Sequence, residues 1–241
     1  MYFPIRINKY LSESGISSRR EADKLIAEGK VTINGRKASL GEMVSEDDAV
    51  KVEGALKELV YILYNKPAGI VTNGARAGEK EIKDVLQLKQ EVFPVGRLDK
   101  ESRGLILLTN DGRLTDKLLS PRNYHEKEYE VEVDRPLTEN DLRQLRQGIT
   151  LDGGFITKKC RIKKLGSCAF SIILTEGKNR QIRRMCQALD YEVIDLNRVR
   201  IMNLRQEGIL EGHYKVLHDE KLETLLAELG LGERRTEPVN D

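Results

Sequence analysis

The order of strand-like and helix-like segments after residue 60 is the feature that most restricts the fold of this chain. Strand candidates outnumber helix candidates, and the two kinds do not alternate regularly along the sequence. A doubly wound fold requires regular alternation, so this order predicts an α+β fold with helices flanking a mixed sheet. The strand candidates are 60–64, 92–95, 104–109, 129–133, 155–164, 168–175 and 193–201, and the helix candidates are 81–87, 111–119, 138–147, 179–189 and 219–229.

Three of these segments carry more specific signals. The apolar run 104–109, GLILLT, is typical of a strand that is covered on both faces. Asn110 follows it and is expected to cap the helix 111–119. In the helix 179–189, apolar residues recur at a spacing that forms one buried face, and basic residues recur on the opposite face. The buried set is Ile182, Met185, Cys186 and Leu189, and the opposite set is Arg180, Arg183, Arg184 and Gln187.

Several function classes are excluded at this level. The apolar runs are far shorter than the about 20 residues that cross a bilayer, and the N-terminus lacks the apolar segment of a signal peptide. The three cysteines, Cys160, Cys168 and Cys186, are odd in number and widely spaced, which indicates neither a disulfide framework nor a zinc site. We therefore expect a cytoplasmic protein without a membrane partner or a metal.

The formal net charge of +2 argues against a nucleic-acid partner until it is divided by segment. Residues 207–241 carry −5, so residues 1–206 carry +7. Within these, residues 1–40 carry +4 and residues 158–184 carry +8. Two basic patches in a balanced chain are a possible footprint for a polyanion, although solvated surfaces would give the same count.

The first 53 residues form a compact pattern of two helices and a hairpin. A helix over 6–14 is followed by Ser18–Glu21, a capping-box sequence that opens a second helix ending at Gly29. Asn34-Gly35 between two short strand candidates is typical of a type I′ hairpin turn. A mixed segment at 55–58 is a candidate linker.

This segment resembles the S4 RNA-binding domain, which implies a domain over 1–56 that contacts RNA along its second helix and hairpin. The residues that meet the S4 pattern are Arg6, Lys9, Leu11, Gly15, Ser18, Arg19, Ala22, Ile26, Gly29, Val31, Asn34 and Gly35. The candidate RNA-binding residues are Arg6, Lys9, Arg19, Arg20, Lys24 and Arg36. Such cations touch phosphate, which positions RNA without specifying its sequence. A small αβ module without RNA is the alternative.

The loop 96–104, GRLDKESRG, is the strongest candidate for chemistry. It is polar, lies between two apolar strand candidates, and carries Asp99 at its centre. Its local pattern alone also fits an ordinary solvated turn in which Asp99 bonds its own backbone.

This loop and its strand, GRLDKESRGLILLTNDG, resemble the central motif of rRNA pseudouridine synthases of the RsuA/RluB/RluE/RluF type. Three further motifs of that family follow in its order: KPAG at 66–69, KEY at 127–129 and GKNRQIRRM at 177–185. HEKEY at 125–129 and KKC at 158–160 are most similar to the RluF branch. The resemblance implies a catalytic domain over 60–241, built on a mixed, mainly antiparallel sheet and ending in a short acidic tail.

The resemblance also implies an activity and site residues. The enzyme would isomerise uridine to pseudouridine in rRNA, with 23S rRNA as the expected target, as a monomer and without metal, nucleotide or other cofactor. Asp99 would be the nucleophile, Arg183 its charged partner, and Tyr129 the residue that stacks on the uracil. The other residues with implied roles are Arg97, which enters the RNA where the base leaves, Arg180 and Arg184, which bind phosphate, and Leu98 and Ile182, which line the pocket.

Two alternatives to a 23S rRNA enzyme stay open. A sister enzyme could act on 16S rRNA or tRNA, because RNA shape and pairing set the target and the sequence discriminates these poorly. A non-catalytic RNA-binding ribosome-assembly factor could retain the same fold. Such a factor predicts damage at Asp99, Tyr129 or Arg183, and all three residues are intact.

Overall fold

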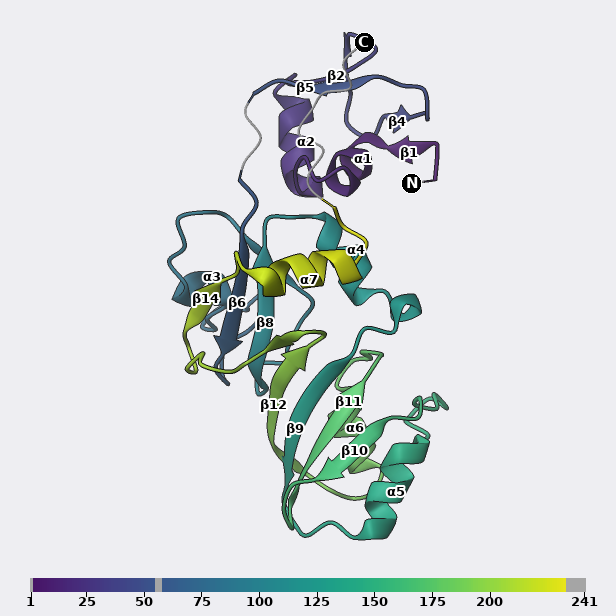
Figure 1. Cartoon of the computed structure of the whole chain (residues 1–241), viewed down its shortest axis with the longest axis vertical. Helices are drawn as coiled ribbons and strands as arrows, with labels where there is room; N and C mark the ends of the chain where they lie inside the picture. The colour runs from purple at the N-terminus through teal and green to yellow at the C-terminus, as the bar shows by residue number, and fades with distance from the viewer. Residues whose placement is uncertain (1, 55–57, 233–241) are drawn as a thin grey trace.

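The computed structural model describes residues 2–54 and 58–232, and its N-terminal part is a small helical module (Figure 1). Helices α1 and α2 pack against the three-stranded sheet β3-β2-β5, and β1 pairs with β4. This arrangement confirms the predicted helix–helix–hairpin pattern. The elements are β1 (Ile5–Arg6), α1 (Ile7–Glu13), α2 (Arg19–Ala27), β2 (Val31–Ile33), β3 (Arg36–Lys37), β4 (Met43–Val44) and β5 (Val50–Val52).

Local signals in this module act as the sequence predicts. The hydroxyl of Ser18 accepts a hydrogen bond from the Glu21 N–H at 3.3 Å, which caps α2. Asn34 and Gly35 both have positive φ, 52° and 79°, as a type I′ turn between β2 and β3 requires.

The rest of the described chain is built on one nine-stranded sheet with helices on its faces (Figure 1). The strand order is β10-β11-β9-β12-β8-β6-β14, with β7 added beside β8 and β13 beside β12. Among the described strands only the pair β12–β8 is parallel, so the sheet is mixed and mainly antiparallel, as predicted. The elements are β6 (Tyr61–Lys66), α3 (Ile82–Val85), β7 (Phe93–Val95), β8 (Arg103–Thr109), α4 (Arg113–Leu119), the 3₁₀ helix η1 (Pro121–Asn123), β9 (Lys127–Val133), α5 (Glu139–Gln147), β10 (Arg161–Lys164), β11 (Ala169–Leu174), α6 (Gln181–Gln187), β12 (Val193–Ile201), β13 (Leu204–Arg205), β14 (Tyr214–Val216) and α7 (Glu220–Glu228).

Strand β8 is covered on both faces, which is why its sequence is apolar without alternation. Leu105 and Leu107 belong to a cluster that includes residues of α4 and α7. Ile106 and Leu108 belong to a separate cluster with Ile82 of α3. A further cluster fills the other end of the sheet, where α5 and α6 cover β9, β11 and β12. The run 104–109 is therefore buried on both faces of the sheet.

The N-terminal module touches the large sheet domain at the start of α4. A Cβ atom added at Gly15 would lie 2.8 Å from Nε of Arg113, so glycine permits this close approach. The Arg113 guanidinium is itself paired with Asp111 at 2.8 Å, and the buried Asp111 carboxylate accepts the hydroxyl of Tyr61 at 2.8 Å. The module thus rests on a buried ionic group at the end of β8.

One predicted helix cap is wrong. Asn110 does not cap α4, because its side-chain oxygen accepts the Val60 N–H at 2.8 Å and its amide donates to the Glu58 carbonyl. These two hydrogen bonds instead connect the Asn110 side chain to the residues just before β6. The neighbouring Asp111 accepts the Arg113 N–H at 3.0 Å and supplies the cap-like contact.

Two predicted segments are shorter than expected. The strand 155–164 reduces to β10, because the N–H of Lys158 donates to the carboxylate of Glu176 and the N–H of Ile149 to the hydroxyl of Thr157. These bonds replace strand pairing. The helix 179–189 reduces to α6, because Arg180 has a left-handed φ of 49° and lies outside the helix.

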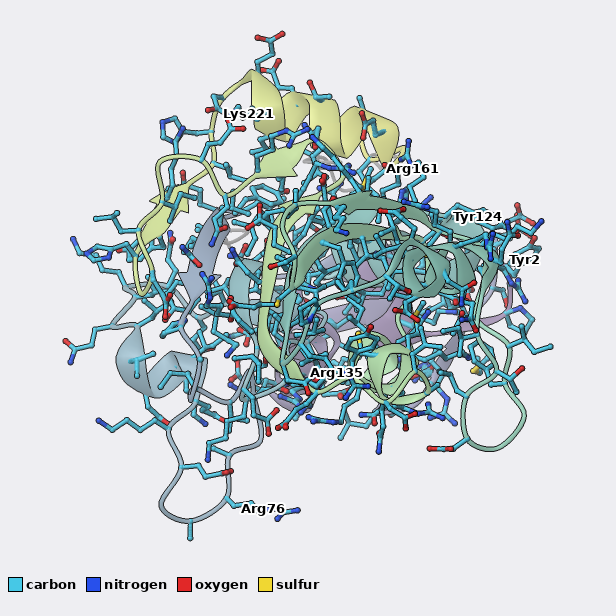
Figure 2. All side chains as sticks on the ribbon, turned by 90° about the horizontal axis from the view of Figure 1, so that it is seen from below. Tyr2, Arg76, Tyr124, Arg135, Arg161 and Lys221 are labelled. Atoms are coloured by element: carbon cyan, nitrogen blue, oxygen red, sulfur yellow. The ribbon has the colours of Figure 1, made fainter. Side chains whose placement is uncertain are left out.

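The outside of the described chain is strongly charged, and Figure 2 shows Arg76 and Arg161 extending away from the ribbon. In residues 2–54 and 58–232 no helix is long and apolar enough to span a bilayer. The candidate linker at 55–58 falls largely outside the described residues, as does much of the acidic tail at 233–241.

Candidate active site

The loop that carries Asp99 connects β7 to β8 and is fastened on both sides of the carboxylate. The buried hydroxyl of Thr72 donates to the Leu98 carbonyl at 2.7 Å and accepts the Leu98 N–H at 3.0 Å. The Gly69 N–H donates to the Lys100 carbonyl at 2.7 Å. The residues before and after Asp99 are therefore fixed, whereas its own side chain is 31% exposed. An ordinary solvated turn would lack these long-range restraints.

Lys66 explains why the KPAG motif accompanies this loop. Its side chain is fully buried, and its ammonium donates to the carbonyls of Pro67 and Ile70 at 2.8 and 2.7 Å. The turn that presents Gly69 to the Asp99 loop is thus closed around a cation. Burial lowers the pKa of Lys66 to about 8, and the negative charge of Asp99 opposes that change.

Four residues form a row across the sheet beside this loop. The strand registers place Lys66 opposite Gly104, Gly104 opposite Arg198, and Arg198 opposite Tyr129. Side chains of directly opposite residues lie on the same face of a sheet, so Lys66, Arg198 and Tyr129 share one face.

Gly104 is required in this row. A Cβ atom there would lie 2.5 Å from the backbone N and O of Arg198, and φ is 108°. Both facts exclude a side chain, and the parallel pairing of β8 with β12 depends on the glycine.

Arg198 is the least expected member of the row. Its side chain is 4% exposed, and Nε donates to the Leu105 carbonyl at 2.6 Å. Its Nη2 is buried and has no hydrogen-bond partner within residues 2–54 and 58–232. An unpaired buried guanidinium nitrogen is costly, and such groups are found where a ligand or strain explains them.

The charged partner of Asp99 differs from the prediction. Nη1 of Arg180 lies 3.8 Å from the Asp99 carboxylate and 2.9 Å from that of Glu101. Arg183 instead donates to the Val193 carbonyl at 3.0 Å and reaches Ser102 Oγ at 3.4 Å. Because Arg180 lies before α6 in a left-handed conformation, its side chain turns back toward the loop. Arg183 holds the segment that follows Asp99.

Arg180 and Arg184, which were predicted to bind phosphate, each have a partner in this structure. Arg180 is engaged by Asp99 and Glu101, and Nη2 of Arg184 donates to the Asp152 carbonyl at 2.8 Å. Arg180 and Arg183 both contact residues within 99–102.

Tyr129 joins the two predicted pocket residues. It is half-buried and packs against two hydrophobic clusters, one of which contains Leu98 and the other Ile182. Leu98 lies in the Asp99 loop and Ile182 in the first turn of α6. An aromatic ring that packs against both apolar clusters can hold a planar base, and Leu98 directly precedes Asp99 in the chain.

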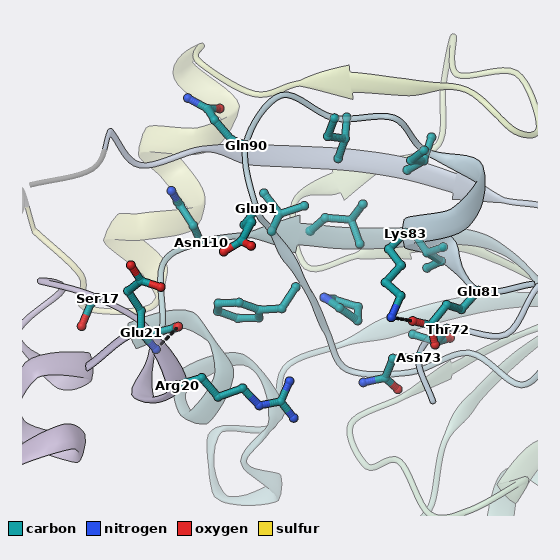
Figure 3. A pocket seen from close by; sticks show the side chains of 18 of the residues that line it. Ser17, Arg20, Glu21, Thr72, Asn73, Glu81, Lys83, Gln90, Glu91 and Asn110 are labelled. Atoms are coloured by element: carbon teal, nitrogen blue, oxygen red, sulfur yellow. Dashed lines mark hydrogen bonds and ion pairs between the residues drawn. The ribbon is translucent and has the colours of Figure 1, made fainter. Parts of the chain in front are cut away.

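Arg97, which precedes Leu98 in the Asp99 loop, lines a cleft. It is exposed, and its Nη1 donates to Asn73 at 2.7 Å. Both line this cleft of about 1080 Å³ between the N-terminal module and the sheet domain (Figure 3). Arg20 and Lys24 of α2 line the same cleft, so the structure brings these three predicted RNA-binding residues together.

The other predicted RNA-binding residues of the module are exposed but do not line this cleft. Lys9 pairs with Glu13 at 3.4 Å, and Arg36 pairs with Glu42. The residues in this group are Arg6, Lys9, Arg19 and Arg36.

Site roles for Thr72, Lys66 and Arg198 were not predicted from the sequence. The KPAG motif was the available signal for Lys66, but the contacts of Thr72 and Arg198 depend on pairing between distant segments. In residues 2–54 and 58–232, His, Cys, Asp and Glu side chains form no group of three placed to hold a metal ion.

Comparisons with known proteins agree with this geometry. Residues 60–188 match the RNA pseudouridylate synthase family and residues 5–50 match the S4 domain. The dual-specificity RNA pseudouridine synthase RluF of Escherichia coli K12 is 48% identical over 224 residues, covering 90% of this chain and 77% of that protein. The ribosomal large subunit pseudouridine synthase B of Bacillus subtilis is 35% identical, covering 92% and 96%.

A solved pseudouridylate synthase crystal structure superposes with a TM-score of 0.69 at 29% identity, covering 93% of this chain and 99% of that one. The predicted family, fold class and enzyme class are confirmed. With an S4 domain ahead of a sheet domain that carries the Asp99 loop and Tyr129, this chain belongs to the RNA pseudouridylate synthase family, as a RluF-type member of the RsuA group.

Proposed function

We propose that this enzyme isomerises a specific uridine in ribosomal RNA, with 23S rRNA as its target. The observation that carries the proposal is the Asp99 loop, fixed by Thr72 and Gly69 while its carboxylate stays partly exposed. The names of the relatives support the substrate class, since one is a ribosomal large subunit pseudouridine synthase.

The reaction breaks the bond between N1 of uracil and C1′ of ribose and forms a bond between C5 and C1′. The proton on C5 is lost and N1 gains one, so the reaction is redox-neutral. We assign the nucleophile to Asp99, because carboxylates serve as covalent nucleophiles elsewhere. Arg180 pairs with this carboxylate, and Arg183 acts as a positioning residue that holds residues 101 and 102.

The substrate base has to leave its stack to reach Asp99. We propose that it stacks on Tyr129 between Leu98 and Ile182, while Arg97 occupies the place that it vacates. Extrusion of a paired base costs a few kcal/mol, and a cation at the gap offsets part of this cost. Exposed cations of the S4 module would hold the surrounding RNA through its phosphates.

The remaining properties follow from this function. We propose domains over 1–56 and 60–241, a monomeric enzyme without nucleotide or other cofactor, and a location in the reducing cytoplasm, where ribosomal RNA is made. The free state of the described cysteines Cys160, Cys168 and Cys186 supports such a compartment.

The proposal is tested with purified enzyme and separate unmodified transcripts of 23S rRNA, 16S rRNA and tRNA. The expected result is pseudouridine at one or a few positions of the 23S transcript, and none with Asp99→Ala. Modification of 16S rRNA or tRNA alone would show that the target RNA is not 23S rRNA, although the reaction is the one proposed. Binding of all transcripts without modification would favour the non-catalytic assembly factor.

A further inference from the structure

Tyr124 is an exposed aromatic residue that the Asp99 site does not use. It is 62% exposed and follows η1 with a left-handed φ of 54°. Non-glycine residues held in that region are uncommon and concentrate at ligand-binding positions. The ammonium of Lys158 lies 4.4 Å from the centroid of its ring, which fixes the orientation of the ring at the surface.

Lys158 lies against the ring of Tyr124, and further exposed cations follow in its own segment and in the loop before α6. Lys158, Lys159, Arg161 and Lys178 are all exposed, and they come from two segments distant from Tyr124 in sequence. Arg161 bonds Glu126, two residues after Tyr124, and the ammonium of Lys178 lies 5.0 Å from the ring of Phe155. In the view of Figure 2, Tyr124 and Arg161 are both labelled at the upper right of the molecule. We call Tyr124, Lys158, Lys159, Arg161 and Lys178 the Tyr124 shelf.

The acidic groups beside the shelf are already engaged. The carboxylate of Glu126 bonds both Arg161 and Arg200. The buried carboxylate of Glu176 accepts the Lys158 N–H and the side-chain amide of Gln181. The shelf therefore presents a net positive charge to solvent.

The shelf is connected to the active-site loop through a short series of bonds. Lys158 and Gln181 share the carboxylate of Glu176, at 3.0 and 2.8 Å. The side chain of Gln181 also accepts the Lys178 N–H at 3.0 Å. Arg180, the residue before Gln181, pairs with Asp99. One loop, 176–181, thus separates the shelf from the catalytic carboxylate.

We propose that the Tyr124 shelf binds the single-stranded RNA next to the uridine undergoing isomerisation, with an unpaired base stacked on Tyr124 and phosphates on the cations. This inference rests on the proposed function, because extrusion of a uridine leaves its neighbours unpaired. Unpaired bases stack on aromatic side chains, and cations beside the ring follow the backbone. Tyr124 would hold the RNA in register while the base reacts.

RNA fits this surface better than an acidic peptide does. A peptide would satisfy the cations, but it would not require an aromatic ring held outward beside the active-site loop. The contacts of residues 176–181 link the shelf to the loop that carries Asp99, where RNA is proposed to bind.

The experiment compares the full-length protein with Tyr124→Ala and with Lys158→Gln/Lys159→Gln. The probe is the 23S transcript fragment that the wild-type enzyme modifies, with 2-aminopurine in place of a purine beside the target uridine. Tyr124→Ala is expected to raise KM about 10-fold at unchanged kcat and to remove the quenching of 2-aminopurine on binding, since one stacking contact contributes about that factor. The double lysine variant is expected to reduce the salt slope of log K by about 1.4, at about 0.7 per contact with single-stranded RNA.

Matched variants at the far edge of the sheet are the controls. Tyr214→Ala on β14 and Lys215→Gln/Lys221→Gln are expected to change neither KM, quenching nor the salt slope. Shelf variants that match these controls in all three readouts would overturn the proposal, and so would preferential binding of poly-glutamate over RNA. If the wild type modifies no RNA, poly(U) affinity and salt slope are compared across the same variants. If the shelf variants then lose poly(U) binding, the shelf is still an RNA-binding surface, although the proposed function is wrong.

Discussion

The Asp99 site and the exposed surface of the S4 module use the same kinds of charged residue in opposite ways. At the site, Lys66 and Arg198 are buried and bonded to backbone carbonyls, and the Asp99 loop is fixed through the residues on either side of Asp99. On the module, cations such as Arg19 and Arg36 are exposed. Rigid geometry is needed where a bond is broken, whereas a group of exposed cations is enough to hold a polyanion.

The largest expected effect comes from the carboxylate itself. Asp99→Asn keeps the shape of the side chain but removes the nucleophile, so kcat is expected to fall on the order of 10⁴-fold or more. The measurement is single-turnover pseudouridine formation, with RNA affinity as the control. A variant that retains more than a tenth of wild-type turnover would exclude Asp99 as the nucleophile.

Gly104→Ala tests the close contact between β8 and β12. The added Cβ would meet backbone atoms 2.5 Å away at a φ of 108°, so we expect unfolding to become easier by about 3 kcal/mol or more. The control is Gly154→Ala, which also has a positive φ but no atom within 4 Å. It is expected to cost about 1 kcal/mol. Equal losses of thermal stability in the two variants would contradict this explanation.

Lys66 predicts a pH dependence of stability with a defined sign. Burial lowers its pKa from 10.5 in the unfolded chain to about 8 in the folded one, so the unfolded chain binds more protons between pH 8 and 10.5. Stability relative to Lys66→Met is then expected to rise across this window, by about 2–3 kcal/mol. Denaturant unfolding at pH 7 and pH 10.5 measures the change. Parallel pH profiles for the two proteins would show that Lys66 titrates normally.

The two arginines near Asp99 are expected to differ in importance. Arg183→Gln releases residues 101 and 102 and should lower kcat about 100-fold. Arg180→Gln should lower it only about 10-fold, because Arg180 is 44% exposed and such ion pairs are screened. The measurement is kcat at saturating RNA, with Arg180→Lys as the charge-retaining variant. A larger loss of kcat in Arg180→Gln than in Arg183→Gln would assign the main electrostatic role to Arg180.

The smallest effect is expected on the S4 side of the cleft. Arg20→Ala with Lys24→Ala should raise KM three- to five-fold without changing kcat, and should reduce the salt slope by about 2. Lys30→Ala, exposed beyond the end of α2, is the control. A change in kcat instead of KM would mean that the module also shapes the catalytic site.

Local signals in the sequence were sufficient for much of the fold. The Asn34-Gly35 turn, the Ser18 cap and the doubly covered strand 104–109 depend on neighbours in sequence, and the structure confirms each of them. Asn110 was misassigned because Val60, its partner, lies 50 residues away.

The site residues also differ in whether the sequence could predict them. The family motifs point to Asp99 and Tyr129, and the structure places Tyr129 in the row that Gly104 permits. The pairing of Asp99 with Arg180 could not be predicted from helical spacing, because it depends on a left-handed residue that ends the periodicity. The unpartnered nitrogen of Arg198 results from strand register across β8, β12 and β9, which no local pattern encodes.

The most direct test maps pseudouridines in total RNA from cells that lack this gene and carry a plasmid copy of either the wild-type protein or Asp99→Asn. We expect one or a few 23S rRNA positions to lose pseudouridine on deletion, to regain it with the wild-type copy, and to stay unmodified with Asp99→Asn. Full restoration by Asp99→Asn would contradict the assignment of this loop as the active site.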